Sequence, residues 1–388
     1  MSMSKCRILF VIGKLSLNGA CRSLIALLNA IQDEYDISLF VSSYGGEAWD
    51  RIPKSVKILP EIPIYKAWRE SLRDSIKESL GRRDWRAIMY RCLVAMERGL
   101  HLKLGSMMFL PKVTGSWDIV CGYTDGFVAE IVANKIDGAK KKASWVHQNY
   151  EKDPIPRRSL RAFEKIDYAV GVSVDAIRHF TNVVGARFKG RTHVVHNITE
   201  AERVRRLSEE PIDEEATHRF NIVTIGRVSP EKGYAVIPKT MKFLVEQGLD
   251  VGCTIIGPNL PSHEAEVMAE AKELGVADRI KFVGAKANPY PLVKSCDCYV
   301  QPSIAEGWGM AISEALVLKK PVVCTRLPVF AEQVRDGENG FLVEWTADGF
   351  AEAIRVILKG EVALRCGFIG RVLCSADNVR QEFAALVG

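Results

Sequence analysis

The sequence predicts an α/β protein built from two Rossmann-like, doubly wound parallel-sheet domains that face a deep cleft. Three observations indicate this class: the chain length, the similar opening of the two halves, and strand-like runs that are apolar on both faces. At 388 residues, the chain is longer than one hydrophobic core usually serves, so two domains are expected. Runs that are apolar on both faces are typical of central parallel strands, which helices cover on each side.

The first half opens with an apolar strand at 6–13, a polar loop at 14–19 and an apolar helix at 20–31. This order is typical of a parallel α/β unit. Further strands of this half are predicted at 37–41, 119–122, 143–147, 168–173 and 193–195.

The second half repeats this opening with a strand at 220–226, a loop at 227–233 and a helix at 234–244. Further strands are predicted at 252–256, 280–283, 298–300, 321–324 and 340–343. We place the boundary in the polar stretch 199–218, which gives domains of 1–200 and 201–374. Because open α/β sheets bind ligands beyond the carboxyl ends of their strands, the deepest crevice is expected between the halves.

Residues 65–104 depart from this alternation and predict a helical insertion in the first domain. The apolar positions of its first helix are Trp68, Leu72, Ile76 and Leu80, and those of its second are Trp85, Ile88, Met89, Leu93, Met96 and Leu100. From 60 to 115 the chain has eleven Lys and Arg against six Asp and Glu, so most of the net charge of +6 is local. Two interpretations stay open. The insertion is either a helix pair with a solvated charged face, or a basic, aromatic surface for an anionic membrane or a polyanionic acceptor.

The composition, 47% hydrophobic and 26% charged, is that of an ordinary globular protein. The apolar run near the start is too short for a membrane span and lacks the form of a secretory signal, so we expect a cytoplasmic protein. Its ten cysteines lie mostly in apolar runs, as reduced core residues do, and their spacing gives no metal site. We therefore expect no metal and no cofactor, and no nucleic acid as a partner.

A loop after the first strand of the second half carries two cations, Arg227 and Lys232, five residues apart. Arg227 can hold two oxygens with its planar fork, and Lys232 acts as a point charge, a combination suited to a diphosphate. The alternative is a solvated loop with an ion pair to Glu231. The corresponding loop of the first half offers Gly19, whose backbone can approach the same anion.

The stretch 306–314 places two carboxylates, Glu306 and Glu314, across a glycine-rich turn that opens an apolar helix. Glu306 is expected in the loop and Glu314 in the first turns of the helix. Backbone amides at a helix start lack intrahelical partners and suit phosphate oxygens, and Gly309 lets a ligand approach them closely. The alternative is that Glu314 is merely a solvated surface charge.

Together these segments resemble the GT-B glycosyltransferases, in particular the retaining, nucleotide-sugar-dependent enzymes of family 4, the group 1 glycosyltransferases. The resemblance is best from 221 to 343. The matching motifs are Gly226-Arg227, Glu231-Lys232-Gly233, Ile255-Ile256-Gly257, Phe282-Val283-Gly284, Gln301-Pro302-Ser303, Glu306-Gly307-Trp308-Gly309, Glu314-Ala315 and Pro321-Val322-Val323. The first half matches more loosely, through Gly19, Arg22, Trp145-Val146-His147 and Val172-Ser173.

The resemblance implies a hexosyltransferase that moves a sugar from UDP- or GDP-sugar to an acceptor hydroxyl with retention of configuration. In it, Arg227 and Lys232 would neutralise the diphosphate, Glu306 and His147 would meet the transferred sugar, and Glu314 would hold the donor ribose. The resemblance also assigns the following residues to the donor site: Gly19, Val283, Gly284, Gly309, Met310 and Ala311. It further implies that 1–200 is the acceptor side, that 201–374 binds the donor, and that a final helix at 375–388 packs back on the first domain.

The acceptor is expected to be a saccharide or a lipid-linked intermediate of cell-surface polysaccharide or glycolipid synthesis, handled at the inner membrane face. His147 has a structural alternative as a strand-end histidine. The chain departs from many relatives in carrying Asn18-Gly19 where they have two glycines. Two other functions were weighed: a nucleotide-sugar epimerase of the same fold, which lacks identifiable acid and base groups here, and a non-catalytic binding scaffold. A dinucleotide oxidoreductase is disfavoured because no Gly-x-Gly-x-x-Gly follows either opening strand.

Overall fold

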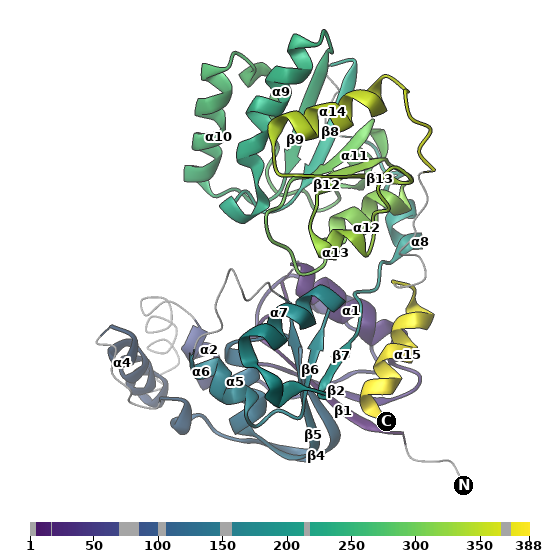
Figure 1. Ribbon diagram of the computed structural model, residues 1–388. Coiled ribbons are helices and arrows are strands. Elements are labelled where there is room, and N and C mark those ends of the chain that lie inside the picture. The colour runs from purple at the N-terminus through teal and green to yellow at the C-terminus, as the bar shows by residue number, and fades with distance from the viewer. Residues whose placement is uncertain are drawn as a thin grey trace. The chain divides into compact units, whose positions relative to one another are not determined.

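The computed structural model describes residues 5–16, 18–69, 85–99, 106–147, 157–212, 218–365 and 374–388. The chain divides into two compact units, each with one parallel sheet and its own helices (Figure 1). The first unit comprises Met1–Val172, Ile177–Val195 and Arg380–Gly388, and the second comprises Ser173–Ala176 and His196–Val379. Among the described residues, no helix is long and apolar enough to cross a membrane.

The first unit holds a seven-stranded sheet in the order β3-β2-β1-β4-β5-β6-β7. Its strands are β1 (Arg7–Ile12), β2 (Asp36–Val41), β3 (Lys57–Ile58), β4 (Val113–Gly122), β5 (Ile136–Val146), β6 (Tyr168–Gly171) and β7 (Thr192–Val194). The pairing is parallel throughout; Ile8 of β1, for example, lies opposite Ile37 of β2 and Ile119 of β4. The chain thus starts in the middle of the sheet and winds outward on both sides, which confirms the doubly wound class.

Strands β4 and β5 begin well before their predicted starts at 119 and 143. The early part of β4 exposes three successive residues, and early β5 alternates buried or half-buried with exposed positions. Apolar runs therefore mark only the buried ends of these strands. Trp117 nevertheless reaches the core, with an exposed fraction of 6%. The short edge strand β3 also gave no apolar run and was missed.

The helices of the first unit are α1 (Gly19–Ile31), α2 (Pro63–Arg69), α4 (Trp85–Gly99), α5 (Phe127–Lys135) and α6 (Arg157–Phe163). Helices α7 (Val174–Val184) and α15 (Ala376–Val387) begin in residues of the second unit and continue in the first. Helix α1 begins after Asn18, whose side chain accepts a hydrogen bond of 2.9 Å from the Cys21 amide. Within the first unit, Phe383 near the end of α15 stacks on Phe10 of β1, with ring centres 5.9 Å apart.

Helix α4 buries one face and exposes several of the apolar positions named from the sequence. Tyr90 and Val94 are buried in the core of the first unit, whereas Trp85 is 67%, Met89 71% and Met96 49% exposed. The exposure of these three apolar residues fits the second interpretation of the insertion, a surface that presents aromatic and apolar side chains. The predicted apolar positions Leu72, Ile76 and Leu80 lie outside the described residues.

The second unit holds a six-stranded parallel sheet in the order β10-β9-β8-β11-β12-β13. Its strands are β8 (Phe220–Ile225), β9 (Val251–Ile256), β10 (Ile280–Phe282), β11 (Cys298–Gln301), β12 (Val322–Thr325) and β13 (Gly340–Val343). All six lie within two residues of their predicted ranges, because their cores are continuous apolar runs.

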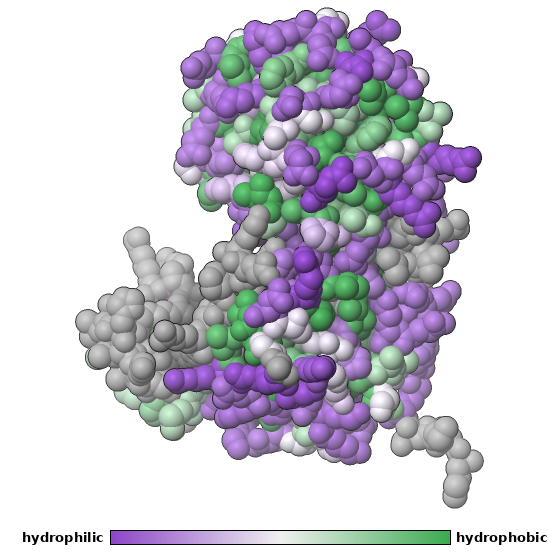
Figure 2. Space-filling view, viewed as in Figure 1, coloured by the Kyte–Doolittle hydropathy of each residue, from purple (hydrophilic) through white to green (hydrophobic). Residues whose placement is uncertain are grey.

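The helices of the second unit are α8 (Ala201–Leu207), α9 (Ile237–Glu246), α10 (Pro261–Glu273), α11 (Tyr290–Ser295), α12 (Met310–Val317), α13 (Pro328–Ala331) and α14 (Ala347–Leu358). Helices α9 and α14 lie side by side (Figure 1). Helix α10 buries only every fourth residue, His263, Val267 and Ala271, and its outer surface is mostly hydrophilic (Figure 2). Helix α8 forms inside the polar stretch expected to be a linker, because Val204 packs on Tyr290 and Val317.

Candidate functional site

The strand order of the second unit fixes where a ligand site can form. Strand β8 pairs with β9 on one side and with β11 on the other, so the chain reverses its winding direction between β8 and β11. Crevices at such a switch point, beyond the carboxyl ends of the strands, are where open α/β sheets bind ligands. Arg227 and Lys232 follow β8, and Glu306 follows β11. The second unit therefore brings these three predicted site residues to its switch point.

Lys232 ends a short 3-10 helix, η4 (Pro230–Lys232), and a tight turn at Gly233 follows it. Gly233 has φ of 71°, and a Cβ there would lie 1.9 Å from the Pro302 carbonyl oxygen, so only glycine fits this close approach of the two loops. That approach brings the Lys232 ammonium into an ion pair with Glu306 Oε1. The two side chains are 20% and 15% exposed, so a ligand can still reach both.

Glu231 does not take the role of partner to Lys232 that the solvated-loop alternative gave it. Its Oε1 accepts a hydrogen bond of 2.6 Å from the Ser229 hydroxyl. Burial raises the pKa of the Glu231 carboxyl, but the Ser229 hydroxyl and the charges of Arg227 and Lys232 more than offset this and hold the pKa below its ordinary value. Glu231 is thus an ionised, internally satisfied loop residue.

Arg227 lies one residue beyond Gly226 at the end of β8, with its side chain exposed. Within the described ranges it forms no ion pair, unlike Lys232. Its guanidinium therefore remains available for an anion at the carboxyl end of the central strand.

The turn between Glu306 and α12 is shaped by Gly309. This residue has φ of 81°, and a Cβ there would lie 2.7 Å from a ring carbon of Phe330. Gly309 is the N-cap of α12, and no side chain caps the helix start. The amides of Met310 and Ala311 consequently open the helix without a side-chain cap, the arrangement that suits phosphate oxygens.

Glu314 lies in the second turn of α12 and is only 3% exposed. Its Oε1 accepts a hydrogen bond of 3.0 Å from the hydroxyl of Tyr290 on α11. The interpretation of Glu314 as a solvated surface charge is therefore wrong. Tyr290 was missed at the sequence level, because a tyrosine between two prolines carries no signal for a carboxylate partner twenty-four residues later.

Val283 and Gly284 follow β10, also at the carboxyl end of the second sheet. The Gly257 amide donates to the Gly284 carbonyl over 2.8 Å, and the Val283 amide donates to the Ile255 carbonyl over 3.1 Å. These bonds extend the β9–β10 pairing beyond the strands. Both residues lie on the β9 side of β8, whereas Glu306 and Glu314 follow β11 on its other side.

His147 lies in the first unit, directly after β5. Its Nε2 is 2.8 Å from the Tyr123 carbonyl oxygen, which can only accept, so Nε2 carries the proton and Nδ1 of the neutral ring is an acceptor. Burial lowers the His147 pKa, while the Asp125 carboxylate and the Tyr123 carbonyl oppose that shift. The contact fits both a structural histidine and one that accepts a hydrogen bond from a sugar hydroxyl.

Gly19 is the first residue of α1 in the first unit and is exposed. The side chain of Asn18 already satisfies the Cys21 amide at this helix start. Asn18 therefore accepts a hydrogen bond from an amide, that of Cys21, which would be available to an anion if position 18 were glycine.

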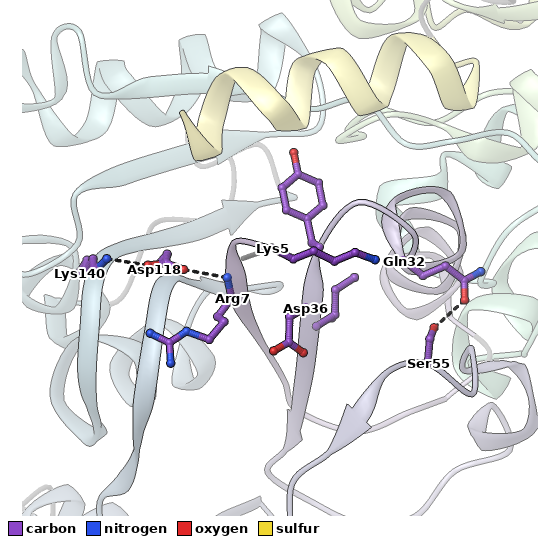
Figure 3. Close-up of a pocket in the computed structure, with 9 residues that line it drawn as sticks. Lys5, Arg7, Gln32, Asp36, Ser55, Asp118 and Lys140 are labelled. Carbon is purple, nitrogen blue, oxygen red and sulfur yellow. Dashed lines mark hydrogen bonds and ion pairs between the residues drawn. The ribbon is translucent and has the colours of Figure 1, made fainter. Parts of the chain in front are cut away.

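A cavity of about 680 Å³ lies at the opposite, amino-terminal edge of the first sheet. Figure 3 shows Asp118 of β4 joined to Lys140 and to the Arg7 amide, at 2.7 and 2.8 Å. The Arg7 amide, followed by the charge and hydrogen bond of Lys140, lowers the pKa of Asp118 to about 2. The charged residues of this cavity thus pair with one another and with backbone groups at the strand ends, and a ligand site is not expected at this edge. Within the part of the chain that the structure describes, no His, Cys, Asp and Glu side chains form a metal-binding group.

Comparison with known proteins gives a family for part of the chain. Residues 208–369 match the family described as "Glycosyl transferases group 1". An uncharacterized glycosyltransferase of Methanocaldococcus jannaschii is 22% identical over 202 residues, 49% of each chain. The phosphatidyl-myo-inositol mannosyltransferase of Mycolicibacterium smegmatis is 32% identical over 155 residues, 39% of each chain. The chain spans about half or less of the length of these curated relatives.

The fold as a whole is shared with solved structures. HepE of Anabaena, in complex with UDP and glucose, superposes with a TM-score of 0.68 over 98% of both chains, at 18% sequence identity. At that identity the likeness establishes a common fold.

Proposed function

From the GT-B fold of the chain and the group 1 glycosyltransferase segment at residues 208–369, we propose that the protein transfers a hexose from a nucleoside diphosphate sugar to an acceptor hydroxyl. The observation that carries this proposal is the arrangement at the β8–β11 switch point. There Arg227, which forms no ion pair within the described residues, combines with a Lys232–Glu306 pair and the uncapped start of α12. Together they supply cations, an acid and amides. Transfer with retention of the anomeric configuration is part of the proposal.

The chemistry follows from charge development in the transition state. As the anomeric bond breaks, negative charge grows on the leaving diphosphate and positive character grows on the sugar ring. Fixed cations and amides next to the diphosphate stabilise that state more than the ground state. Arg227, Lys232 and the amides of Met310 and Ala311 would fill this role, with Glu306 directed at sugar hydroxyls and Glu314 at the ribose.

The donor is proposed to be a UDP- or GDP-sugar. The HepE structure contains UDP and glucose, which supports UDP for a protein of this fold. Calorimetry with UDP, GDP and ADP would identify the base, and NMR of the product would give the anomeric configuration. An inverted product would refute retention, and tight nucleotide binding without turnover on any acceptor would favour a scaffold over an enzyme.

Metal independence is a separate expected result. Because Arg227 and Lys232 can neutralise the diphosphate, turnover of the purified protein should be unchanged by EDTA and by later addition of Mg²⁺ or Mn²⁺. The measurement is nucleoside diphosphate release with and without chelator. Loss of turnover in EDTA that Mn²⁺ restores would show that the two cations are insufficient.

The acceptor is proposed to be a lipid-linked or surface saccharide intermediate, handled on the cytoplasmic face of a membrane. The phosphatidyl-myo-inositol mannosyltransferase relative is named for a lipid acceptor, which supports this class. The structure adds five exposed large apolar residues in the first unit: Trp85, Met89 and Met96 on α4, and Met108 and Phe109 on the 3-10 helix η2 (Ser106–Phe109), which contacts α4. We call these five residues the apolar patch. The three residues of α4 lie four and seven positions apart and so share one helix face. Met108 is 80% and Phe109 63% exposed, a gathering that suits a membrane interface.

This patch predicts vesicle binding that depends on apolar contact. The Trp85→Ser, Met89→Ser double variant should sediment less with vesicles of phosphatidylcholine and phosphatidylglycerol than the unaltered protein does. The control is Phe243→Ser, Leu260→Ser, which alters two exposed apolar residues of the second unit, 40% and 46% exposed. Equal sedimentation of both variants would contradict a role for the patch. Reversing Arg69, Arg73 and Lys77 at low salt tests the charged part of the same insertion.

A further inference from the structure

A buried hydrogen-bond chain connects the backbone of β8 to Glu306. The Ile225 amide donates to the Tyr299 hydroxyl oxygen over 3.2 Å, and that hydroxyl donates to Gln301 Oε1 over 2.6 Å. Gln301 Nε2 donates to the Ser303 hydroxyl over 2.8 Å, which donates to Glu306 Oε1 over 3.2 Å. Tyr299 and Ser303 are 0% and Gln301 1% exposed, so none of the three exchanges its partner for water.

The direction of this chain is fixed at both ends. A backbone amide can only donate, so the Tyr299 oxygen receives the Ile225 proton and its own proton points to Gln301. An ionised carboxylate can only accept, so the Ser303 proton points to Glu306. The Gln301 amide fits between them in one orientation, with its oxygen toward Tyr299 and its nitrogen toward Ser303. Every donor in the chain therefore points toward Glu306.

We infer that Gln301 and Ser303 are positioning residues that hold Glu306 in place to meet the sugar of the donor. Glu306 lies in the loop between β11 and α12 and forms an ion pair with Lys232, a flexible side chain that the diphosphate would also attract. When the donor draws Lys232 toward its phosphates, the Ser303 hydroxyl remains as the fixed contact of the Glu306 carboxylate. Charge-assisted hydrogen bonds of this kind are stronger than neutral ones.

This inference depends on the proposed function, because it needs Glu306 to contact the transferred sugar and not the nucleotide. It therefore predicts a specific split in affinity. The gain in affinity of UDP-glucose over UDP comes from the sugar, so Ser303→Ala and Gln301→Met should reduce that gain and leave UDP binding unchanged. The loss of one hydrogen bond to a charged group corresponds to about ten- to a hundredfold.

The test is calorimetric titration of the full chain with UDP, UDP-glucose, GDP and GDP-mannose, together with turnover. In the Glu306→Gln background, Ser303→Ala should have no further effect on the sugar-dependent gain, because the two residues act as one unit. A merely structural role would instead weaken both the nucleotide and the nucleotide sugar, and it would do so equally in both backgrounds. That outcome, or an unchanged gain in Ser303→Ala, would overturn the inference.

Two controls separate the possible failures. Thr240→Val removes another hydroxyl that is 0% exposed in the same unit, on α9, and should lower the melting temperature without changing the sugar-dependent gain. Isosteric Gln301→Glu supplies a second variant should Gln301→Met fold poorly. If the unaltered protein binds UDP and GDP at least as tightly as UDP-glucose and GDP-mannose, the proposed contact of Glu306 with the sugar is refuted. If the unaltered protein binds the nucleotide sugar more tightly and Ser303→Ala retains that difference, only the positioning inference is refuted.

Discussion

Replacing Lys232 with alanine is expected to lower turnover by about 100- to 1,000-fold, the usual cost of removing one preorganised group that stabilises transition-state charge. Two effects act together. The leaving diphosphate loses a cation, and Glu306 loses its ion-pair partner at the β8–β11 switch point. Because the stabilisation is greatest in the transition state, the loss should appear mainly in kcat and less in KM. Donor consumption under saturating donor measures it.

Arg227→Ala should give a loss of similar size but without disturbing Glu306, since Arg227 forms no ion pair within the described residues. The two variants therefore separate diphosphate neutralisation from support of the acid. Lys239→Ala is the matched control, a lysine of the same unit that is 61% exposed and paired to Glu270 on α10. Near-native turnover in both Lys232→Ala and Arg227→Ala would contradict the proposal that these two cations neutralise the diphosphate.

Much of the second unit could be predicted from the sequence, because its strands are continuous apolar runs and its site residues sit in loops directly after them. Position in the chain then gives position in space: parallel strands align their carboxyl ends, so Arg227, Lys232 and Glu306 meet wherever β8 and β11 are neighbours. The sequence did not show which acid partners Lys232. Glu231 is adjacent to Lys232 in the sequence, yet its carboxylate accepts a hydrogen bond from the Ser229 hydroxyl within the same loop.

The questions that the sequence left open involve side chains whose environment depends on distant segments. Glu314 is buried against Tyr290 because α11 and α12 pack together, and no local pattern records that contact. Which face of α4 is exposed stayed open at the sequence level for a related reason. Trp85 and Met89 are apolar, and a periodicity argument sends apolar residues inward, whereas the first unit buries Tyr90 and Val94 instead. An exposed apolar face is itself a signal of function, which periodicity alone cannot distinguish from a core.

Glu314→Ala is expected to weaken UDP and UDP-glucose equally, in contrast to the variants that act through Glu306. The proposed contact of Glu314 is with the ribose, which both ligands contain, so the sugar-dependent gain should stay intact. Hydrogen bonds to a charged group contribute about 1.5–3 kcal/mol, which corresponds to roughly a ten- to hundredfold rise in both dissociation constants. Calorimetric titration of the same variant with both ligands measures it.

Two further variants, Tyr290→Phe and Glu270→Ala, serve as comparisons for Glu314→Ala. Tyr290→Phe removes the hydroxyl donor but keeps the carboxylate, so it should weaken both ligands less than Glu314→Ala does, and Glu270→Ala on α10 should leave both unchanged. A buried carboxylate costs stability unless it is hydrogen-bonded, and the Tyr290 hydroxyl supplies one such bond to Glu314, which is 3% exposed. If Glu314→Ala instead raised the melting temperature and left ligand binding intact, the carboxylate would be a tolerated structural burden and not the ribose contact. If Glu314 contacts the ribose, Glu314→Ala should instead lower the affinity for both ligands with little change in the melting temperature.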